Sequence, residues 1–158
     1  SRIQVVKIGS GCVISDRKEY DRISHICYEI TRMKYEENVN TAMVVSGAVR
    51  FGLLEEVHKG LRSPKDLFEK IRDTGELQRL ARIGQSKLMG FYAECFEKGY
   101  EKYIAQVGKR KNKPLATTQI LAKYRDFEDR TEKKSIINAI KADSFNLYTI
   151  PLYNHKPD

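Results

Sequence analysis

Apolar runs and amphipathic stretches alternate along the first part of the chain. Residues 3–8 form a short, β-rich apolar segment that stops at Gly9-Ser10-Gly11, which is typical of a buried strand followed by a tight turn. Residues 18–35 repeat apolar side chains at helical spacing, with charged residues between them. A second apolar run at residues 41–45 is too short to favour a helix and ends at Ser46-Gly47-Ala48, before another helical stretch. We therefore expect the order strand, helix, strand, helix.

This alternation predicts an α/β fold built as a three-layer sandwich. Parallel neighbouring strands need a crossover connection, and a helix is the usual one, so we expect a central, mainly parallel sheet with helices on both faces. A length of 158 residues is that of one domain, and we take residues 1–158 as a single unit. In folds of this class, ligands collect at the carboxyl ends of the strands.

The middle of the chain has a helical pattern that glycines are expected to interrupt. Ser63 and Pro64 supply a cap and a first-turn proline, which predicts a helix that starts there. Gly75 is expected to interrupt this helix. Residues 85–98 carry a wide apolar face typical of a well-buried helix, and Gly99 is expected to end it.

The last third of the chain returns to β-like segments. Residues 103–107 and 115–121 flank a basic stretch, which predicts a hairpin inserted at about residues 101–115. A helix is expected after the acidic turn at residues 126–130, and a final strand at residues 147–153.

The loop of this expected hairpin concentrates positive charge. Four of the five residues from Lys109 to Lys113 are basic, and the whole chain carries a net charge of +8. One interpretation is a contact with phosphate or nucleic acid; the other, which we favour, is a solvated turn whose charges discourage edge-to-edge strand pairing. Aromatic side chains do not alternate with the basic ones, so a nucleic-acid partner is not expected.

The composition limits the class of protein and the cellular compartment that can be expected. A hydrophobic fraction of 41% beside 32% charged residues is typical of a globular protein. The apolar runs fall far short of the roughly 20 residues that cross a bilayer, so we expect no membrane segment. The three cysteines, Cys12, Cys27 and Cys95, have neither a zinc-site nor a disulfide spacing, and the histidines are scattered. We expect no metal site in the chain and a reducing, cytoplasmic location.

The turn after the first expected strand could hold a phosphate. Glycines allow the backbone to approach a ligand, their amides can point at phosphate oxygens, and a lysine supplies a point charge. Here Lys7 comes just before Gly9, Ser10 and Gly11. The order differs from the Walker pattern, in which the lysine follows the glycines. An ordinary turn at the end of a strand explains these residues about equally well.

The turn after the second expected strand is of the same kind. Ser46, Gly47 and Ala48 stand before a helix, whose first-turn amides and positive dipole end can bind a carboxylate or phosphate. The simpler interpretation is that the Ser46 side chain caps the helix. Because the two turns follow strands that we expect to be neighbours, they could face one crevice and hold two anionic groups a fixed distance apart. That arrangement suggests phosphoryl transfer to an anionic acceptor.

At these residues the chain resembles a known family. Val5-Val-Lys-Ile-Gly-Ser-Gly11 resembles the opening strand and glycine turn of the amino acid kinase family, and Val44-Val-Ser-Gly-Ala-Val49 resembles the second-strand motif of its glutamate 5-kinases. Later motifs of those enzymes have counterparts in the same order, at Ile83-Gly-Gln-Ser-Lys-Leu-Met89, Asp126-Phe-Glu-Asp-Arg130, Asn138-Ala139 and Ile150-Pro-Leu-Tyr-Asn154. The resemblance extends over essentially the whole chain and implies an amino acid kinase-like fold.

The resemblance also implies an activity. Such an enzyme transfers the terminal phosphoryl group of ATP, with Mg²⁺, to the side-chain carboxylate of L-glutamate, the entry step of proline synthesis. The catalytic residue would be Lys7, whose charge would stabilise the moving phosphoryl group. The phosphate-binding residues would be Gly9, Ser10 and Gly11. The residues that bind the amino acid would be Ser46, Gly47, Ala48 and Asn154.

The chain departs from the family pattern in two places, and these departures lead to an alternative expectation of a non-catalytic module. In the family a nucleotide-binding half follows the acceptor-binding lobe, whereas this sequence ends at Asp158, so we expect little kinase activity from the chain alone and self-association into a homo-oligomer through exposed apolar surface. The family also reads Asn-Glu-Asn-Asp where this chain reads Asn154-His-Lys-Pro-Asp158. The alternative is a non-catalytic module of the same fold that serves amino-acid binding, regulation or assembly.

Overall fold

The fold alternates strands and helices in the order that the hydrophobic pattern predicts. A computed structural model describes residues 2–9, 17–108, 113–146 and 148–155. Its elements are β1 (Arg2–Ile8), α1 (Arg17–Glu37), β2 (Val39–Val45), α2 (Ala48–His58), the 3-10 helix η2 (Pro64–Phe68), α3 (Thr74–Val107), β3 (Ala116–Ala122), the 3-10 helix η3 (Tyr124–Phe127), α4 (Arg130–Ser144) and β4 (Thr149–His155).

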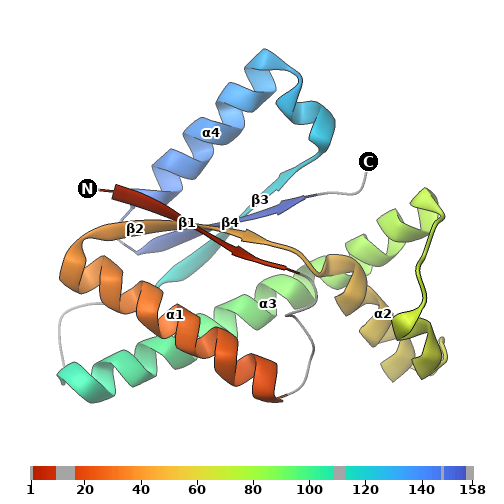
Figure 1. Cartoon of the computed structure of the whole chain (residues 1–158), viewed down its shortest axis with the longest axis horizontal. Helices are drawn as coiled ribbons and strands as arrows, with labels where there is room; N and C mark the ends of the chain where they lie inside the picture. Colours follow the sequence, from red (N-terminus) through yellow and green to blue (C-terminus); the bar gives the residue numbers. More distant parts are fainter. Residues whose placement is uncertain (1, 10–16, 109–112, 147, 156–158) are drawn as a thin grey trace.

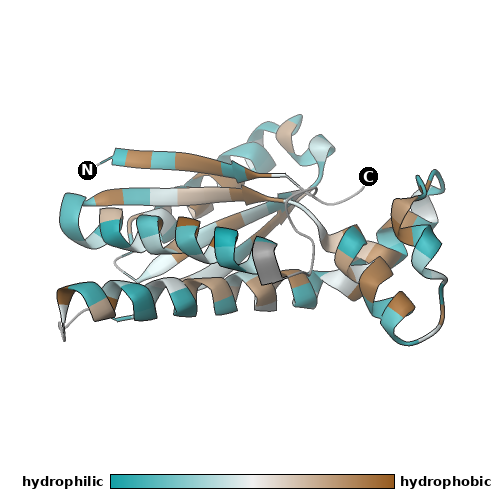
Figure 2. Ribbon diagram, turned by 60° about the horizontal axis from the view of Figure 1, so that its bottom comes forward, coloured by the Kyte–Doolittle hydropathy of each residue, from teal (hydrophilic) through white to brown (hydrophobic). Residues whose placement is uncertain are grey.

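The four strands form one sheet, in which every pairing is parallel. The spatial order is β1-β2-β4-β3, so β4 lies between β2 and β3 (Figure 1). The expectation of an α/β fold with a mainly parallel sheet is confirmed. Apolar residues at alternate positions of β1 turn toward the main core, and polar and apolar residues alternate along this strand in Figure 2.

Helices cover the two faces of the sheet unequally. α1 and α3 lie on one face, where the large buried cluster includes Ile23, Met43 and Phe96, each with no exposed surface. α4 lies on the opposite face, above β3 and β4 (Figure 1), over a small cluster of Ile120, Ala122 and Ile136. Figure 2 shows the sheet above the layer that α1 and α3 form. The arrangement is compatible with a three-layer sandwich.

The amino edge of the sheet is closed by a buried lysine of α1. Lys34 has only 5% of its surface exposed, and its Nζ donates hydrogen bonds to the carbonyl oxygens of Asn146 at 2.6 Å and Thr149 at 2.8 Å. Burial lowers the pKa of this ammonium to about 8. The end of α1 is thereby attached to the start of β4.

One long helix, α3, replaces two of the expected features. α3 runs through Gly99 without a break, so the expected stop there is wrong. The glycine is needed for packing instead, because a Cβ at this position would lie 2.6 Å from the backbone nitrogen of Tyr28 in α1. Residues 103–107, expected as a strand, form the last turns of α3, where Tyr103 is fully buried.

The expected basic hairpin at about residues 101–115 is therefore wrong as a hairpin. Its first part is helical, and Gly108 ends α3 with a positive φ of 78° that glycine adopts readily. Residues 109–112, which carry most of the basic run, lie outside the described residues. The segment connects a helix to the parallel strand β3, which confirms the other expected strand of the pair.

The start of the expected middle helix is also different. The Ser63 side chain accepts a hydrogen bond from the Lys65 backbone, as a cap residue should, but Pro64 opens only the five-residue η2. α3 begins at Thr74, after an Asp73 cap, so Gly75 lies in its first turn and interrupts no helix. The apolar side chains of this connection do not pack: Phe68 is 84% exposed. Self-association through such surface stays a prediction.

Candidate functional site

The register of the sheet brings the predicted site segments to one edge. Ile8 at the end of β1 pairs with Val45 at the end of β2, and Val45 pairs with Asn154 near the end of β4. The two turns therefore follow neighbouring parallel strands, as expected. Because strands lie about 4.8 Å apart, the ends of β1 and β4 are separated by roughly 10 Å across this carboxyl edge.

The turn after β2 starts α2 without a side-chain cap. The cap residue is Gly47, with a φ of 123°, and among the described residues no side chain accepts a hydrogen bond from the first turn of α2. The interpretation of Ser46 as the helix cap is therefore wrong. The first intrahelical bond runs from the Phe51 nitrogen to the Gly47 oxygen at 2.9 Å, so the preceding amides have no acceptor within the helix. The first turn also lacks an acidic residue, so its positive end stays available to an anion.

Glycines hold the start of α2 directly against α3. A Cβ on Gly84 would lie 1.8 Å from the carbonyl oxygen of Ala48, and a Cβ on Gly52 would lie 2.1 Å from the carbonyl oxygen of Leu80. Only glycine permits such close contact between the two backbones. The first turn of α2 is therefore fixed relative to Gly84 and to Gln85, which follows it.

Gln85 and Asn154 form a hydrogen-bonded pair of amides between α3 and β4. Asn154, whose side chain is on the same face of the sheet as its register partner Val45, is 3% exposed. Its Nδ2 donates to the Oε1 of Gln85 at 2.6 Å. The Nε2 of Gln85 is buried and has no hydrogen-bond partner among the described residues. The sequence pointed to Asn154, whereas Gln85 had no role assigned, although a polar residue among the apolar positions of α3 is a usable signal.

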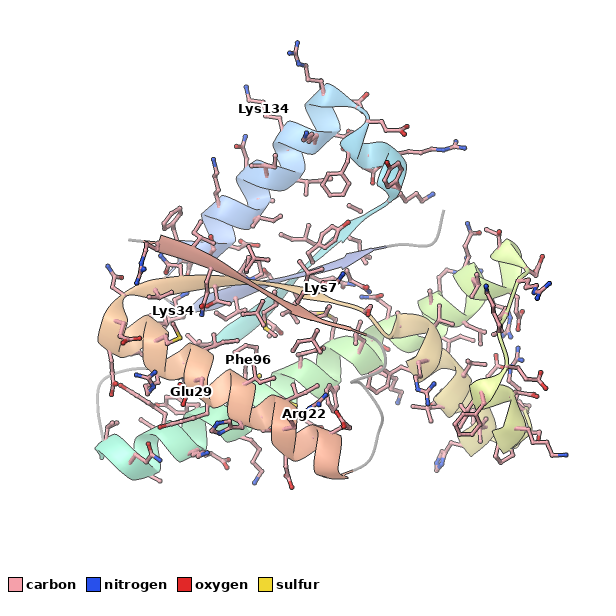
Figure 3. All side chains as sticks on the ribbon, viewed as in Figure 1. Lys7, Arg22, Glu29, Lys34, Phe96 and Lys134 are labelled. Atoms are coloured by element: carbon pink, nitrogen blue, oxygen red, sulfur yellow. The ribbon has the colours of Figure 1, made fainter. Side chains whose placement is uncertain are left out.

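Lys7 lies at the same edge but on the other face of the sheet. Its neighbour Ile8 points into the main core, so the alternation along β1 directs Lys7 to the opposite side. The side chain is exposed, and no described carboxylate lies within ion-pair distance of it. Figure 3 shows Lys7 toward the carboxyl end of β1 and Lys34 near the amino edge. The structure thus brings Lys7 and Asn154 to one edge without placing them on one face.

The glycine turn after β1 is only partly described. Gly9 is exposed, and a Cβ on it would meet nothing within 4 Å, so the space next to this backbone is open toward the described residues. Its φ is outside the left-handed region, so its backbone conformation does not require glycine. Ser10 and Gly11 lie outside the described residues.

An arginine–glutamate cluster supports the projecting part of α2 and α3. Glu56, 7% exposed, pairs with Arg79 at 2.5 Å and with Arg62 at 3.0 Å. The hydrogen bond from Arg79 lowers the pKa of the Glu56 carboxyl, and Arg62 lowers it further. The cluster joins the end of α2 to the first turns of α3. Its positive and negative side chains neutralise one another. We assign it a structural role.

Two further classes of site were sought in the described part of the chain. No group of three or more His, Cys, Asp and Glu side chains is arranged there to hold a metal ion. Within the same ranges, every helix is too short or too polar to cross a membrane.

Comparison with known proteins adds no family to these observations. No model of a known protein family matches the chain, and no curated protein matches it either.

Proposed function

We propose that this chain is the acceptor-binding lobe of a glutamate 5-kinase-like phosphotransferase of the amino acid kinase family. The observation that carries the proposal is the convergence of Lys7, the uncapped start of α2 and the Gln85–Asn154 pair on one edge of a parallel sheet. Open α/β sheets bind their ligands at this edge. The resemblance of the turn sequences to glutamate 5-kinases supplies the substrate, L-glutamate.

The proposed reaction makes different demands on the two ends of the site. A side-chain carboxylate oxygen of the acceptor forms a bond to the terminal phosphorus of ATP, and the bond from that phosphorus to the ADP oxygen breaks. Negative charge on the phosphoryl oxygens is stabilised by Lys7 and by the backbone around Gly9. The acceptor is held by the turn Ser46-Gly47-Ala48 and by Asn154, with the free amides of α2 facing a carboxylate.

The two cofactors of the proposed reaction fit the described residues unequally. ATP supplies the phosphoryl group when bound, and the cation Lys7 beside the open Gly9 backbone suits a phosphate. Magnesium needs several oxygen ligands, and the described residues offer no such cluster. They therefore do not fit a resident Mg²⁺.

The proposal is tested by separating acceptor binding from transfer. Calorimetry with L-glutamate measures binding, and trapping of the acyl phosphate with hydroxylamine in the presence of ATP and Mg²⁺ measures turnover. In a full-length enzyme that also carries the nucleotide-binding half, we expect Lys7→Met to lower turnover at least tenfold with little change in glutamate affinity, because its charge acts mainly in the transition state. The control Lys123→Met changes an exposed lysine at the start of η3. A Lys7→Met variant with full turnover contradicts the proposal.

A non-catalytic amino-acid-binding module is the second candidate. Two observations favour it: Lys7 and Asn154 occupy opposite faces of the sheet, and the described residues hold no cluster of metal ligands. This candidate predicts glutamate binding without any acyl phosphate. Absence of both binding and turnover contradicts both candidates.

A further inference from the structure

The two faces of the sheet are covered by unequal numbers of α-helices. α1 and α3 pack against each other over the face that holds the main core, whereas α4 is the one α-helix of the described chain over the opposite face, above β3 and β4 (Figure 1). A parallel sheet is normally covered on both faces. Two neighbouring strands occupy roughly 10 Å, which is about the diameter of a helix. The opposite face therefore has room for one more helix, beside α4 and above β1 and β2.

The side chains of β1 on this face form an exposed apolar strip. Val5 points away from the main core, and 67% of its surface is exposed although it lies in the middle of a strand. Its register partner Ala42 in β2 is only 7% exposed, so the cover that α4 gives reaches β2 and ends before β1. Lys7, at the carboxyl end of the strip, is the one charged residue on this face of β1. Neither β1 nor β2 contains an acidic residue.

Contacts of α4 show which side of the helix is turned toward this strip. The carboxylate of Asp143 accepts a hydrogen bond from the Oγ1 of Thr118 in β3, at 2.8 Å, so that side of α4 is turned toward the outer strand. Ile136 packs on the sheet. Ile137 lies about 100° farther around the helix, on the side away from Asp143. The side of α4 that carries Ile137 is therefore turned toward β2 and β1.

This side of α4 is basic. Lys133, Ile137 and Lys141 follow one another at intervals of four residues, which places them in one row along the helix. Both lysines are exposed, and no described carboxylate lies within ion-pair distance of either ammonium group. Ile137 is 37% exposed between them. The row thus combines unpaired positive charge with an apolar side chain, next to the apolar strip of β1.

We propose that the strip along β1 and the basic row of α4 bind an acidic amphipathic helix of a partner protein. The apolar side of the partner helix packs on Val5 and Ile137, and its carboxylates pair with Lys133 and Lys141. Its axis lies about 8–10 Å from that of α4, as in other helix pairs. Helix binding of this kind is read from apolar anchors on one side of the helix. The inference is independent of the proposed function, because it uses neither the turns nor the amide pair of the carboxyl edge.

The first test compares synthetic peptides by calorimetry on the whole chain. The probe is a helical peptide of about 18 residues with leucines along one side and glutamates elsewhere. One control peptide has lysine in place of each glutamate, and the other has the same composition as the probe with the leucines scattered. We expect the probe to bind at least about tenfold more tightly than either control. Equal affinity for the probe and either control, or no binding of the probe, overturns the inference.

The second test places the binding on α4. The double change Lys133→Glu with Lys141→Glu should weaken the probe at least about tenfold and make its affinity less dependent on salt. The matched control is Lys65→Glu with Lys70→Glu, two exposed lysines between α2 and α3, which alters the net charge equally and should weaken the probe less than about threefold. Circular dichroism and urea unfolding establish that both variants fold. Equal weakening by the two double variants would mean that only the overall charge attracts the peptide, and would overturn the inference.

A third variant and a competing polyanion complete the test. Ile137→Gln keeps every charge, so it should weaken the probe about threefold or more without altering the salt dependence. A short DNA duplex is the competitor, because any polyanion is attracted to exposed lysines. We expect the duplex to displace the probe poorly. A duplex that binds more tightly than the probe and is lost in the Lys133→Glu, Lys141→Glu variant would make this surface a nucleic-acid site and overturn the inference.

Discussion

The two edges of the sheet treat their polar groups in opposite ways. At the amino edge, Lys34 is buried and makes two short hydrogen bonds to backbone carbonyls at the start of β4. At the carboxyl edge, α2 starts without a side-chain cap, and the Nε2 of Gln85 has no partner in the described part of the chain. Both edges are formed by the same four strands. The strand arrangement alone therefore does not explain why polar groups are paired at one edge and unpaired at the other.

The difference distinguishes structural polar groups from binding groups. α3 and α4 each have an aspartate cap, Asp73 and Asp129, which satisfies first-turn amides with the chain's own carboxylate. α2, the helix that starts at the carboxyl edge, has Gly47 in that position. An edge that leaves amides unpaired gives up stability that a ligand can restore on binding.

The largest expected effect concerns the glycine contact that positions α2. Gly84→Ala places a methyl group 1.8 Å from the Ala48 carbonyl oxygen, so the helices must separate, and we expect a loss of about 3 kcal/mol in the free energy of unfolding. Gly90→Ala in the same helix meets no atom within 4 Å and should stabilise by about 0.5–1 kcal/mol. Urea unfolding measures both. Similar values for the two variants would show that α2 does not depend on this contact.

A pair of lysine variants compares the edges directly. Lys34→Met leaves two backbone carbonyls without their donor, and we expect it to cost about 1–3 kcal/mol. Lys7→Met changes an exposed side chain and should alter stability by less than about 0.5 kcal/mol. Urea unfolding at pH 7 measures the free energies. The comparison between the edges fails if Lys7→Met proves the more destabilising change.

The pH dependence of stability sharpens the assignment of Lys34. Burial lowers its pKa in the folded state from 10.5 to about 8, so between these values the unfolded chain binds more protons than the native one. The contribution of Lys34 to stability therefore increases as the pH rises from about 8 to 10.5. Burial raises the pKa of Tyr35 to about 12 and that of Cys95 to about 11. These two groups make stability fall as the pH rises, and they do so equally in the wild type and in Lys34→Met.

The difference between wild type and Lys34→Met removes that common trend. Unfolding curves of both proteins at several pH values from 7 to about 10.5 should diverge in favour of the wild type. A constant difference over this range would mean that Lys34 titrates normally and is not desolvated.

The smallest expected effects concern the helix starts. Asp129→Ala removes the acceptor for the Thr131 and Glu132 amides, at 2.9 and 3.0 Å, and should cost about 1 kcal/mol without affecting glutamate binding. Ser46→Ala should change stability by less than about 0.5 kcal/mol, because Ser46 caps nothing, but should weaken glutamate binding. Thermal unfolding and calorimetry measure the two quantities. A large loss of stability in Ser46→Ala would restore Ser46 as a structural residue.

The sequence predicts the sheet better than it predicts the long helix. The apolar runs at residues 3–8 and 41–45 identify β1 and β2, because a buried parallel strand needs a nearly continuous apolar segment. Gly99 was expected to end a helix because glycine does so in isolation. Its place within α3 is decided by contact with α1, 71 residues earlier at Tyr28, which no local pattern reveals. Tyr103 similarly belongs to a helix because the core buries it there.

Some features of the candidate site can also be predicted from the sequence, whereas others depend on the tertiary structure. Local turn chemistry points to Gly47, the resemblance to glutamate 5-kinases points to Asn154, and the parallel register of β1, β2 and β4 accounts for their shared edge. Two features need the tertiary structure: the missing cap on α2 and the bond from Asn154 to Gln85, which joins residues 69 positions apart. The face on which Lys7 lies follows from the alternation along β1 once Ile8 is known to be buried.

The strand order has a consequence for synthesis of the protein. β4 is the last strand along the described chain, yet it lies between β2 and β3. While a ribosome is making the chain, β2 can pair with β1, but β3 and the other side of β2 have no strand partner until residues 149–155 have emerged. Such late closure by distant residues slows folding and leaves backbone edges open to other nascent chains, so a chaperone that shields sheet edges should raise the yield.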